Sequence, residues 1–447
     1  MHRPGVRSLP GGDVFGYYLS LALRSFRQHR GLTALIVLSI AVGIGTSMTV
    51  LTVLHVLSGD PIPAKSARLF HVQLDPEPAD GYQPGSEPMD LLTRIDAETL
   101  LQQKRGLRQA MMAGGSGTVD ADGSGQRPLR VPMRHTSADF FPMFDTPFVH
   151  GQAWSAEQDA GRARVAVIGP ALNARLFGGG DSVGRSVRVD GHHLTIVGVL
   201  GHWDPRPAFH DLGTGRYGAD DQLFLPFSTA RDLDLEHRGP MHCFGREIVN
   251  AQTAHNVPCA WIQYWVELRD PAQAPAFKAY LDAYSEQQRA AGRFERPANT
   301  RVRDVMQWLD YKRIVPGDVQ LQVWLAVAFL LVCLINTVGL LLAKFLRRRN
   351  EIGVRRALGA SRGHIFRQCL VEVGIIGGAG GTLGLLLALA GLWLVRQRPA
   401  AYADMVHLDL PMLLLTFALA MVTSVLAGLL PAWQAMQIPP ALQLKSQ

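Results

Sequence analysis

Four long apolar segments constrain the fold of this chain more than any other feature of its sequence. The first, residues 31–59, contains no formally charged residue, and His55 is its only titratable side chain. About 20 apolar residues in an α-helix cross the hydrocarbon core of a bilayer, so this segment is long enough to span a membrane. The four transmembrane helices that we expect cover residues 31–58, 319–343, 369–395 and 411–433. The predicted fold class is an integral membrane α-helical protein with four transmembrane helices, in which a large α+β extracytoplasmic domain is inserted between the first and second helices.

Lysine and arginine residues near the ends of these segments predict the orientation of the chain. Residues 1–30 carry five arginines against one acid, and residues 344–368 carry Lys344 and seven arginines against Glu351. Short basic flanks mark the cytoplasmic side of a membrane. We therefore expect both termini, including the tail 434–447, in the cytoplasm of a bacterium, with the protein in its inner membrane. The domain 59–318 and the short loop 396–410 are then periplasmic.

The N-terminal 30 residues contain a basic, amphipathic segment. Residues 14–30 are typical of a helix that lies on the inner membrane surface with its basic side chains facing anionic lipid. A cleaved secretory signal is the alternative for the first apolar segment. The apolar core of such a signal has only about 7–15 residues, so we expect a retained membrane anchor.

The predicted periplasmic domain contains two strand–helix–strand patterns and a β-rich module. Strands are expected at residues 67–74 and 109–120 around a helix at 88–104, and at 261–268 and 300–303 around a helix at 271–291. The β-rich module is expected over about 129–226, with a hairpin of arms 186–189 and 194–199 that turns at Asp190 and Gly191.

The four cysteines divide between the domain and the membrane. Cys243 and Cys259 fall in the predicted periplasmic domain, where an oxidising compartment favours a disulfide between them; two buried free thiols are the alternative. Cys333 and Cys369 fall in or beside predicted membrane helices and are interpreted as small apolar residues.

Residues 351–361, between the second and third membrane helices, predict a docking element. A helix-forming stretch is followed by Gly359 as a helix stop and by Ser361 as an N-cap for the next helix. The alternative is that the arginines serve membrane topology alone. Topology does not require the Ala-Leu-Gly-Ala-Ser turn at 357–361, which favours docking.

Polar and small residues inside the membrane helices predict helix packing. The third helix carries overlapping small-xxx-small pairs, which allow close approach of helices in lipid. We expect them to pack against a neighbouring helix of the same chain, with a subunit interface as the alternative. Asn336 and Thr337 are expected to make an interhelical hydrogen bond. The alternative, a substrate pathway, is disfavoured because the membrane segments show no line of charged residues. The packing glycines are Gly374, Gly377, Gly378, Gly381 and Gly384.

Several enzymatic and binding functions are disfavoured by the sequence. Residues 179–186 have the spacing of a phosphate loop, but Arg185 stands where lysine belongs and the segment is expected outside the cytoplasm. Histidines show no metal-ligand spacing. The net charge of +7 comes mostly from the cytoplasmic flanks, so nucleic-acid binding is not indicated. We expect no catalytic, metal or cofactor site in this chain.

Together these features resemble the MacB/FtsX-like permeases of ABC transporters over essentially the whole length. The sequence EIGVRRALGAS at 351–361 carries the most specific likeness, and GLLPA at 428–432 matches the end of the family's last membrane helix. Residues 140–144, 164–168, 174–178, 183–185 and 196–199 are similar to a MacB-type periplasmic core domain. The sequence WQAMQ after position 432 departs from the family's basic, polar ending. MacB itself has a fused ATPase domain at its N-terminus, so the resemblance implies a stand-alone permease subunit here.

The resemblance implies a mechanism of mechanotransmission. Two permease chains, either identical or paralogous, would form a dimer. Two separate ABC ATPase subunits, which bind ATP and Mg, would each bind one coupling segment. The transporter would export or extract a peptide, drug or amphiphile. Whether a periplasmic adaptor and an outer-membrane channel take part is left undecided. The alternatives are an FtsX-like signalling subunit that activates an envelope enzyme and a lipoprotein-release permease. The implied coupling residues are Glu351, Gly353, Arg355, Arg356, Ala357, Leu358, Gly359, Ala360 and Ser361.

Overall fold

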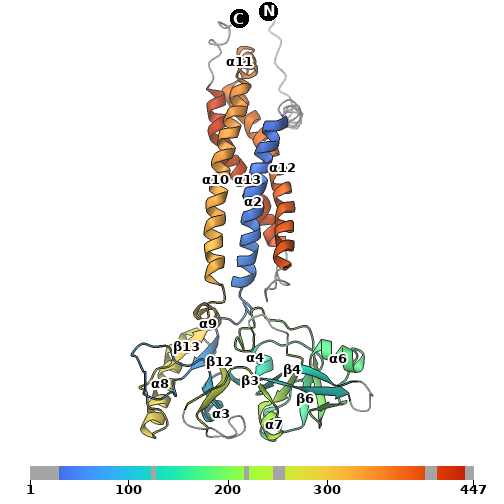
Figure 1. The fold of residues 1–447 in the computed structure, drawn as a ribbon, viewed down its shortest axis with the longest axis vertical. Coiled ribbons are helices and arrows are strands. Elements are labelled where there is room, and N and C mark those ends of the chain that lie inside the picture. The colour runs from blue at the N-terminus through green and yellow to red at the C-terminus, as the bar shows by residue number, and fades with distance from the viewer. Residues whose placement is uncertain (1–29, 122–126, 216–220, 245–256, 398–409, 438–447) are drawn as a thin grey trace, which may run out of the picture. The chain divides into compact units, whose positions relative to one another are not determined.

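The computed structural model describes residues 30–121, 127–215, 221–244, 257–397 and 410–437 (Figure 1). The predicted N-terminal surface helix, most of the loop 396–410 and most of the tail lie outside the described residues. The chain forms two compact units: residues 59–314, here called the sheet unit, and residues 1–58 with 315–447, here called the helical unit.

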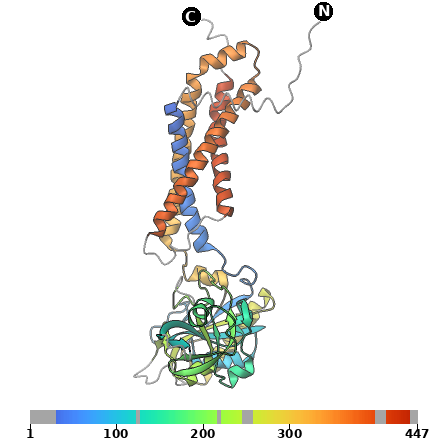
Figure 2. The same ribbon diagram turned by 90° about the vertical axis from the view of Figure 1, so that its right-hand side faces the viewer.

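Four long helices and one short helix build the described part of the helical unit. The long helices are apolar enough and long enough to cross a membrane, and Figures 1 and 2 show them running side by side. Their buried side chains, among them Ile40, Ile44, Ile376 and Ala420, form one core. The five helices are α2 (Arg30–Ser58), α10 (Gly317–Arg347), α11 (Arg349–Ala357), α12 (Arg362–Arg396) and α13 (Leu410–Met436).

All four predicted membrane segments lie within long helices, and two of these helices extend beyond the predicted segments at the ends that flank α11. The predicted helix 319–343 extends to Arg347 in α10, and the predicted helix 369–395 begins at Arg362 in α12. The reason is local: Ser361 caps α12, so the helix starts there and not where the apolar sequence starts.

Thirteen strands form one sheet within the described part of the sheet unit. Its main path is β13-β1-β12-β3-β4-β9-β6-β8-β5, and β2, β7, β10 and β11 pair beside this path. The strands are β1 (Leu69–Gln73), β2 (Leu92–Thr93), β3 (Arg108–Ala121), β4 (Leu129–Thr136), β5 (Phe148–Gly151), β6 (Val165–Ile168), β7 (Ser186–Val189), β8 (His192–Leu200), β9 (Leu223–Pro226), β10 (His237–Arg238), β11 (His242–Cys243), β12 (Cys259–Glu267) and β13 (Arg301–Asp304).

Short helices cover this sheet, and both predicted strand–helix–strand patterns are present. The first is β1–α3–β3 and the second is β12–α8–β13. Residues 88–91 were predicted to be helical, but they are not. The Thr93 side chain caps α3, so the helix begins after Thr93. The helices of this unit are α3 (Arg94–Gln103), α4 (Phe140–Met143), α5 (Ala156–Ala160), α6 (Pro170–Phe177), α7 (Phe227–Asp232), α8 (Ala274–Ala290) and α9 (Val305–Tyr311), with a 3₁₀ turn at Pro271–Gln273.

The β-rich segment 129–226 continues the main sheet. Its first strand, β4, pairs with β3 in antiparallel register from Met112 opposite Thr136 to Val119 opposite Leu129. The predicted hairpin is confirmed as β7 and β8, with Asp190 and Gly191 at positive φ in the turn. A disulfide joins Cys243 on β11 to Cys259 on β12, where the two residues are cross-strand partners.

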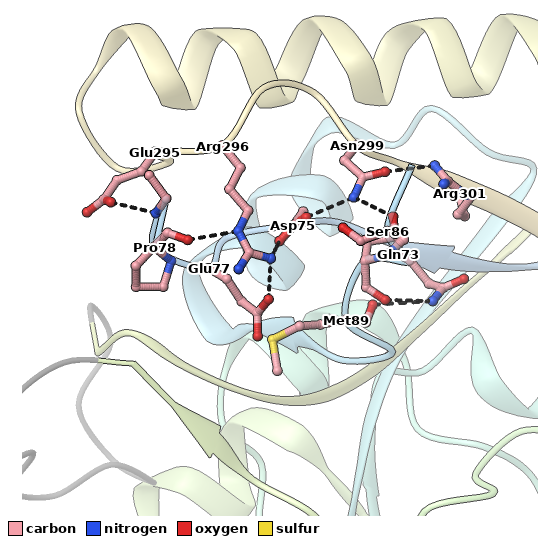
Figure 3. Close-up of polar contacts among 12 residues, drawn as sticks. Gln73, Asp75, Glu77, Pro78, Ser86, Met89, Glu295, Arg296, Asn299 and Arg301 are labelled. Atoms are coloured by element: carbon pink, nitrogen blue, oxygen red, sulfur yellow. Dashed lines mark hydrogen bonds and ion pairs between the residues drawn. The ribbon is translucent and has the colours of Figure 1, made fainter. Parts of the chain in front are cut away.

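A polar network holds the long segment after β1 in place (Figure 3). The Arg296 guanidinium donates to the carbonyl of Pro78 at 2.8 Å and pairs with Asp75 at 3.0 Å. The Asn299 amide donates to Asp75 at 2.8 Å and to the carbonyl of Ser86 at 3.1 Å. The segment is therefore fixed against the chain that precedes β13, although it has no regular secondary structure.

Candidate coupling site

The segment that connects α10 to α12 forms a short helix and a tight turn. Helix α11 ends at Ala357, and Gly359 follows with φ of 101°, a conformation that side chains other than glycine rarely adopt. The Ser361 hydroxyl then accepts a hydrogen bond from the His364 N–H at 3.3 Å and so caps α12. The helix, the glycine stop and the serine cap lie where the sequence predicted them.

Helix α11 has one buried face and one exposed apolar face. Ile352 and Gly353 are buried, and Ile352 packs in the core of the helical unit with Phe345 and Ile365. Val354 is 59% exposed and Leu358 is 83% exposed. These two residues are four positions apart, so they lie on the same side of the segment. Neighbouring exposed apolar side chains of this kind are typical of a surface that contacts a partner.

A buried ionic cluster fastens this segment to the long helices. The Glu372 carboxylate on α12 pairs with Lys344 Nζ on α10 at 2.8 Å and with Arg348 Nη1 at 2.9 Å. Lys344 and Glu372 are both buried. Buried charges are costly unless they are paired, so the three side chains stabilise one another only in this arrangement of the helices.

The ion pairs continue from this cluster onto α11. Arg348 Nε donates to one oxygen of Glu351 at 3.0 Å, and Arg355 Nη2 donates to the other at 2.7 Å. The cavity beside these residues has a volume of about 10 Å³, which is at the lower limit for one water molecule. The ionic cluster is therefore packed too tightly to hold a ligand.

The remaining predicted coupling residues surround the turn. Arg356 Nη1 donates to the carbonyl of Met436 on α13 at 3.4 Å, so this arginine makes a contact within its own chain. Ala360 packs against the core of the helical unit. Ala357 ends α11, next to the exposed Leu358.

Sequence reasoning missed the Lys344–Glu372–Arg348 cluster. Glu372 was visible as an acid at the head of the third apolar segment, and an ionisable residue in such a place is normally paired. Lys344 was counted only as a topology signal. The two could have been matched because Lys344 lies near the C-terminal end of α10 and Glu372 lies in the first third of α12, so both are close to the segment that connects these helices.

The five predicted packing glycines differ from one another in how closely a neighbouring helix approaches them. A methyl group added to Gly377 would lie 2.3 Å from the Ser424 hydroxyl, and one added to Gly381 would lie 2.7 Å from the Ala420 Cβ. These two glycines therefore let α12 approach α13. Gly384 lets α12 approach α2 in the same way, because a methyl group added there would lie 3.1 Å from the carbonyl oxygen of Ala41. An added methyl would meet no atom of the described chain within 4 Å at Gly374 and Gly378.

The predicted interhelical hydrogen bond is present at one of the two residues named for it. The Asn336 amide on α10 donates to the Ser39 hydroxyl on α2 at 3.1 Å. The prediction for Thr337 is wrong, because its buried hydroxyl has no hydrogen-bond partner in the part of the chain that the structure describes. Among those residues there is also no group of three His, Cys, Asp or Glu side chains placed to hold a metal ion.

Comparison with known proteins connects both units to one family. The model of the MacB-like periplasmic core domain matches residues 33–284, and that of the FtsX-like permease C-terminal region matches residues 323–440. The macrolide export ATP-binding/permease protein MacB of Azoarcus sp. is 24% identical over 95% of this chain and 59% of its own length. The pyoverdine export ATP-binding/permease protein PvdT of Pseudomonas aeruginosa is 25% identical over 82% of this chain and 50% of its own length.

The chain thus spans between a half and three fifths of these two relatives. The crystal structure of the periplasmic region of MacB from Actinobacillus actinomycetemcomitans aligns with 55% of this chain and 92% of its own, at 12% identity. Its TM-score of 0.35 is too low to support an argument about the fold. The family assignment depends on the two sequence models, of which the first covers more than half of the chain. The chain belongs to the MacB/FtsX-like permease family of ABC transporters.

Proposed function

We propose that this chain is the permease subunit of an ABC exporter of the MacB type. In this proposal separate ATPase subunits hydrolyse ATP, the exposed face of α11 receives their movement, and the long helices pass it to the sheet unit. The observation that carries the proposal is the ionic cluster of Glu372, Lys344 and Arg348, which ties the segment around α11 to both α10 and α12.

The cluster supports this function because it resists separation of the three helices. Moving α11 independently would draw Arg348 and Glu351 away from their partners and leave Glu372 and Lys344 in a changed environment. Breaking a buried ion pair costs about 3–5 kcal/mol. A push on α11 is therefore expected to move the cytoplasmic ends of α10 and α12 with it.

The proposed complex contains two such permease chains, identical or paralogous, and two ATPase subunits that bind ATP and Mg. The chain would lie in the bacterial inner membrane with both termini in the cytoplasm. Two relatives carry export of a macrolide and of pyoverdine in their names; for this chain we propose a small amphiphile, drug or peptide as the exported compound. An adaptor and an outer-membrane channel would complete the path.

A mechanical signalling role that uses the same coupling helix is the second candidate, and the FtsX-like match over residues 323–440 supports it. The match to the MacB-like core domain over residues 33–284 favours export. The proteins that accompany the chain from native membranes distinguish the two: an ATPase with a periplasmic adaptor supports export, and an ATPase with a cell-wall hydrolase supports signalling.

The test of docking is the substitution Leu358→Asp. Leu358 is the most exposed apolar side chain of this segment, so a carboxylate there leaves the fold intact but places a charge in the proposed interface. Loss of a central interface contact weakens binding by about 2 kcal/mol or more, so we expect ATPase association to weaken about 30-fold. The measurement is the affinity between the purified permease in nanodiscs and the ATPase that accompanies it from native membranes.

The matched control is Val149→Asp, an equally drastic change at an exposed apolar residue of the sheet unit. It is expected to leave ATPase affinity unchanged. Full ATPase affinity in Leu358→Asp, with the thermal midpoint also unchanged, would refute docking at α11. A native preparation that contains no ATPase would refute the proposed function as a whole.

A further inference from the structure

Helix α10 is the least enclosed of the four long helices among the described residues. In its apolar part 22% of the residues are buried, against 44%, 39% and 33% in α2, α12 and α13. Figure 1 shows α10 at the edge of the bundle. One side of α10 therefore has no neighbour in the described part of the chain, and we call this side the Gly339 face. Its exposed residues are Val332, Ile335, Asn336, Gly339 and Ala343.

The apolar side chains of the Gly339 face do not identify its neighbour. Val332 is 62% exposed and Ile335 is 70% exposed, and their spacing from Gly339 places all three on one side of the helix. Lipid tails are as apolar as these side chains, so lipid alone would cover them without cost. The polar and the small residues of the face are the ones that distinguish a lipid neighbour from a protein neighbour.

Asn336 places a carboxamide on this face, inside the apolar part of the helix. No charged residue lies between Asp318 and Lys344, and Asn336 lies about 12 Å from Lys344 along the helix axis, at 1.5 Å per residue. The Asn336 amide donates to the Ser39 hydroxyl on α2 at 3.1 Å. This bond uses one amide hydrogen, and the amide has a second hydrogen and an oxygen that accepts. Lipid tails offer neither a donor nor an acceptor, so a neighbouring protein helix is favoured here.

Gly339 and Ala343 lower the surface of the same face. They are four positions apart and form a small-xxx-small pair, which lets the backbones of two membrane helices approach closely. A methyl group added to Gly339 would meet no atom within 4 Å among the described residues. By contrast, a methyl group on Gly381 of α12 would lie 2.7 Å from the Ala420 Cβ. Gly381 thus serves packing within the chain, whereas Gly339 leaves room for a helix from outside it.

The open side of α12 lacks an exposed amide of this kind. A methyl group added to Gly374 or Gly378 would also meet no atom of the described chain within 4 Å. The exposed polar side chain nearby is Thr382, whose hydroxyl donates to the Gly378 carbonyl of its own helix at 2.9 Å. Because this donor is satisfied within α12, the side that carries Thr382 is compatible with lipid. The Gly339 face of α10 is therefore the better fit for a subunit contact.

The Gly339 face is complementary to itself. Two copies of the chain in one membrane have the same orientation, and a two-fold axis between them brings α10 of one copy parallel to α10 of the other. Near such an axis each residue faces its own counterpart. Two glycines allow close approach of the backbones, and two asparagine amides bond to each other because an amide both donates and accepts. The face therefore fits a second copy of this chain.

We propose that the Gly339 face of α10 packs against the same face of a second copy of this chain and so forms the homodimer contact of the permease. The inference rests on the proposed function for the presence of a permease pair, and it selects an identical partner over a paralogous one. The contact lies in the long helices, so its variants leave the exposed face of α11 unchanged.

The first test is cysteine cross-linking in native membranes. Ile335→Cys is placed in a Cys333→Ala background, which removes the neighbouring native thiol. Oxidation with copper phenanthroline is expected to join two chains through position 335, seen as a dimer on non-reducing gels. The matched control is Leu386→Cys on the open side of α12, where the replaced side chain is 57% exposed. This control is expected to give no dimer band.

The second test measures the strength of the dimer. The full-length chain, with one fluorophore at its C-terminus, is reconstituted in lipid vesicles at several densities, and dimers are counted by single-molecule photobleaching. Gly339→Ile fills the space at the centre of the face and is expected to weaken dimerisation about 10-fold or more. Gly378→Ile adds the same side chain to the open side of α12 and is expected to leave dimerisation unchanged.

The contribution of the amide is tested by Asn336→Leu in the same vesicles. We expect about 3- to 30-fold weaker dimerisation, the range that corresponds to hydrogen bonds between membrane helices. Asn336→Leu also removes the bond to Ser39. Ser39→Ala is therefore the control, because it breaks the bond within the chain and leaves the Asn336 amide in place; it is expected to dimerise like the original chain.

Full dimerisation of Gly339→Ile, or a loss in Gly378→Ile in its place, would overturn the proposal. Cross-linking of Leu386→Cys without cross-linking of Ile335→Cys would do the same. So would a chain that stays monomeric at every density, or that pairs in native membranes with a permease of different sequence. An ATPase that accompanies the chain from native membranes would leave the proposed function standing in each of these cases, so the two proposals can fail separately.

Discussion

Glu372 lies between the buried Lys344 and the partly buried Arg348, and the stability of the helical unit is expected to depend on the charge of Glu372. Glu372→Gln keeps the size of the side chain but leaves Lys344 and Arg348 without their shared counter-charge. Removing one partner of a buried ion pair costs about 3–5 kcal/mol, so we predict a loss of that size in the free energy of unfolding. The measurement is unfolding of the purified chain in detergent, followed by circular dichroism.

Glu351→Gln provides the matched comparison for this prediction. Glu351 pairs with Arg348 and Arg355 at the start of α11, but its side chain is partly exposed. Exposed ion pairs contribute only about 0–1 kcal/mol, so this variant should unfold almost like the original chain. Equal losses in the two variants would show that burial of Glu372 does not control the energetics of the cluster.

At the scale of single residues, the sequence could predict the features that depend on residues nearby in the chain. Gly359 and Ser361 were predictable because a glycine stop and a serine cap depend on residues one to three positions away. The pairing of Lys344 with Glu372 depends on how two helices far apart in the sequence pack. No periodicity or spacing contains that information.

The packing of α12 against its neighbours makes a prediction about two glycines of the same helix. A methyl group on Gly381 would lie 2.7 Å from the Ala420 Cβ, whereas one on Gly378 would meet nothing within 4 Å in the described chain. Because Ala420 has no flexible side chain that could move away, Gly381→Val must displace α13. We expect it to lower the free energy of unfolding by about 1–3 kcal/mol or more, measured by the same unfolding experiment.

Gly378→Val is the control for Gly381→Val, since both add the same side chain to the same helix. It should unfold within about 0.5 kcal/mol of the original chain. A large loss in Gly378→Val would indicate that this face of α12 is also covered, for example by a second permease chain, and would contradict the assignment of the close approach to Gly381 alone.

At the scale of helices and strands, the sequence predicted that an element exists better than it predicted where the element ends or which face it turns to its neighbours. The four long helices were predictable because about 20 apolar residues in a row have few alternatives. The glycines of α12 looked alike in sequence, but the rotation of the helix places Gly377 and Gly381 at α13, whereas a methyl group added to Gly374 or Gly378 would meet no atom within 4 Å among the described residues. Rotation follows from the packing of whole helices, which a small-xxx-small pattern does not determine.

At the scale of the whole molecule, the division into two units could be predicted from the sequence, but the pairing and direction of the strands in the sheet could not. Each described unit has hydrophobic cores of its own, as the long polar stretch between the first two apolar segments predicted. The pairing of β4 with β9 is parallel and that of β6 with β9 is antiparallel. Such non-local pairings depend on packing across the sheet, and strand propensity does not contain them.

The two units also make a prediction about membrane sidedness. The eight basic residues of the segment 344–368 predict that it faces the cytoplasm, so the sheet unit, separated from it by one span, faces the opposite side. Val149→Cys and Leu358→Cys place exposed thiols on the two units, in a Cys333→Ala background that removes the native thiol that is not buried. A membrane-impermeant maleimide should label Val149→Cys in intact spheroplasts and Leu358→Cys in inverted vesicles. Labelling of Leu358→Cys in intact spheroplasts would reverse the orientation, and a cytoplasmic ATPase could then not reach α11.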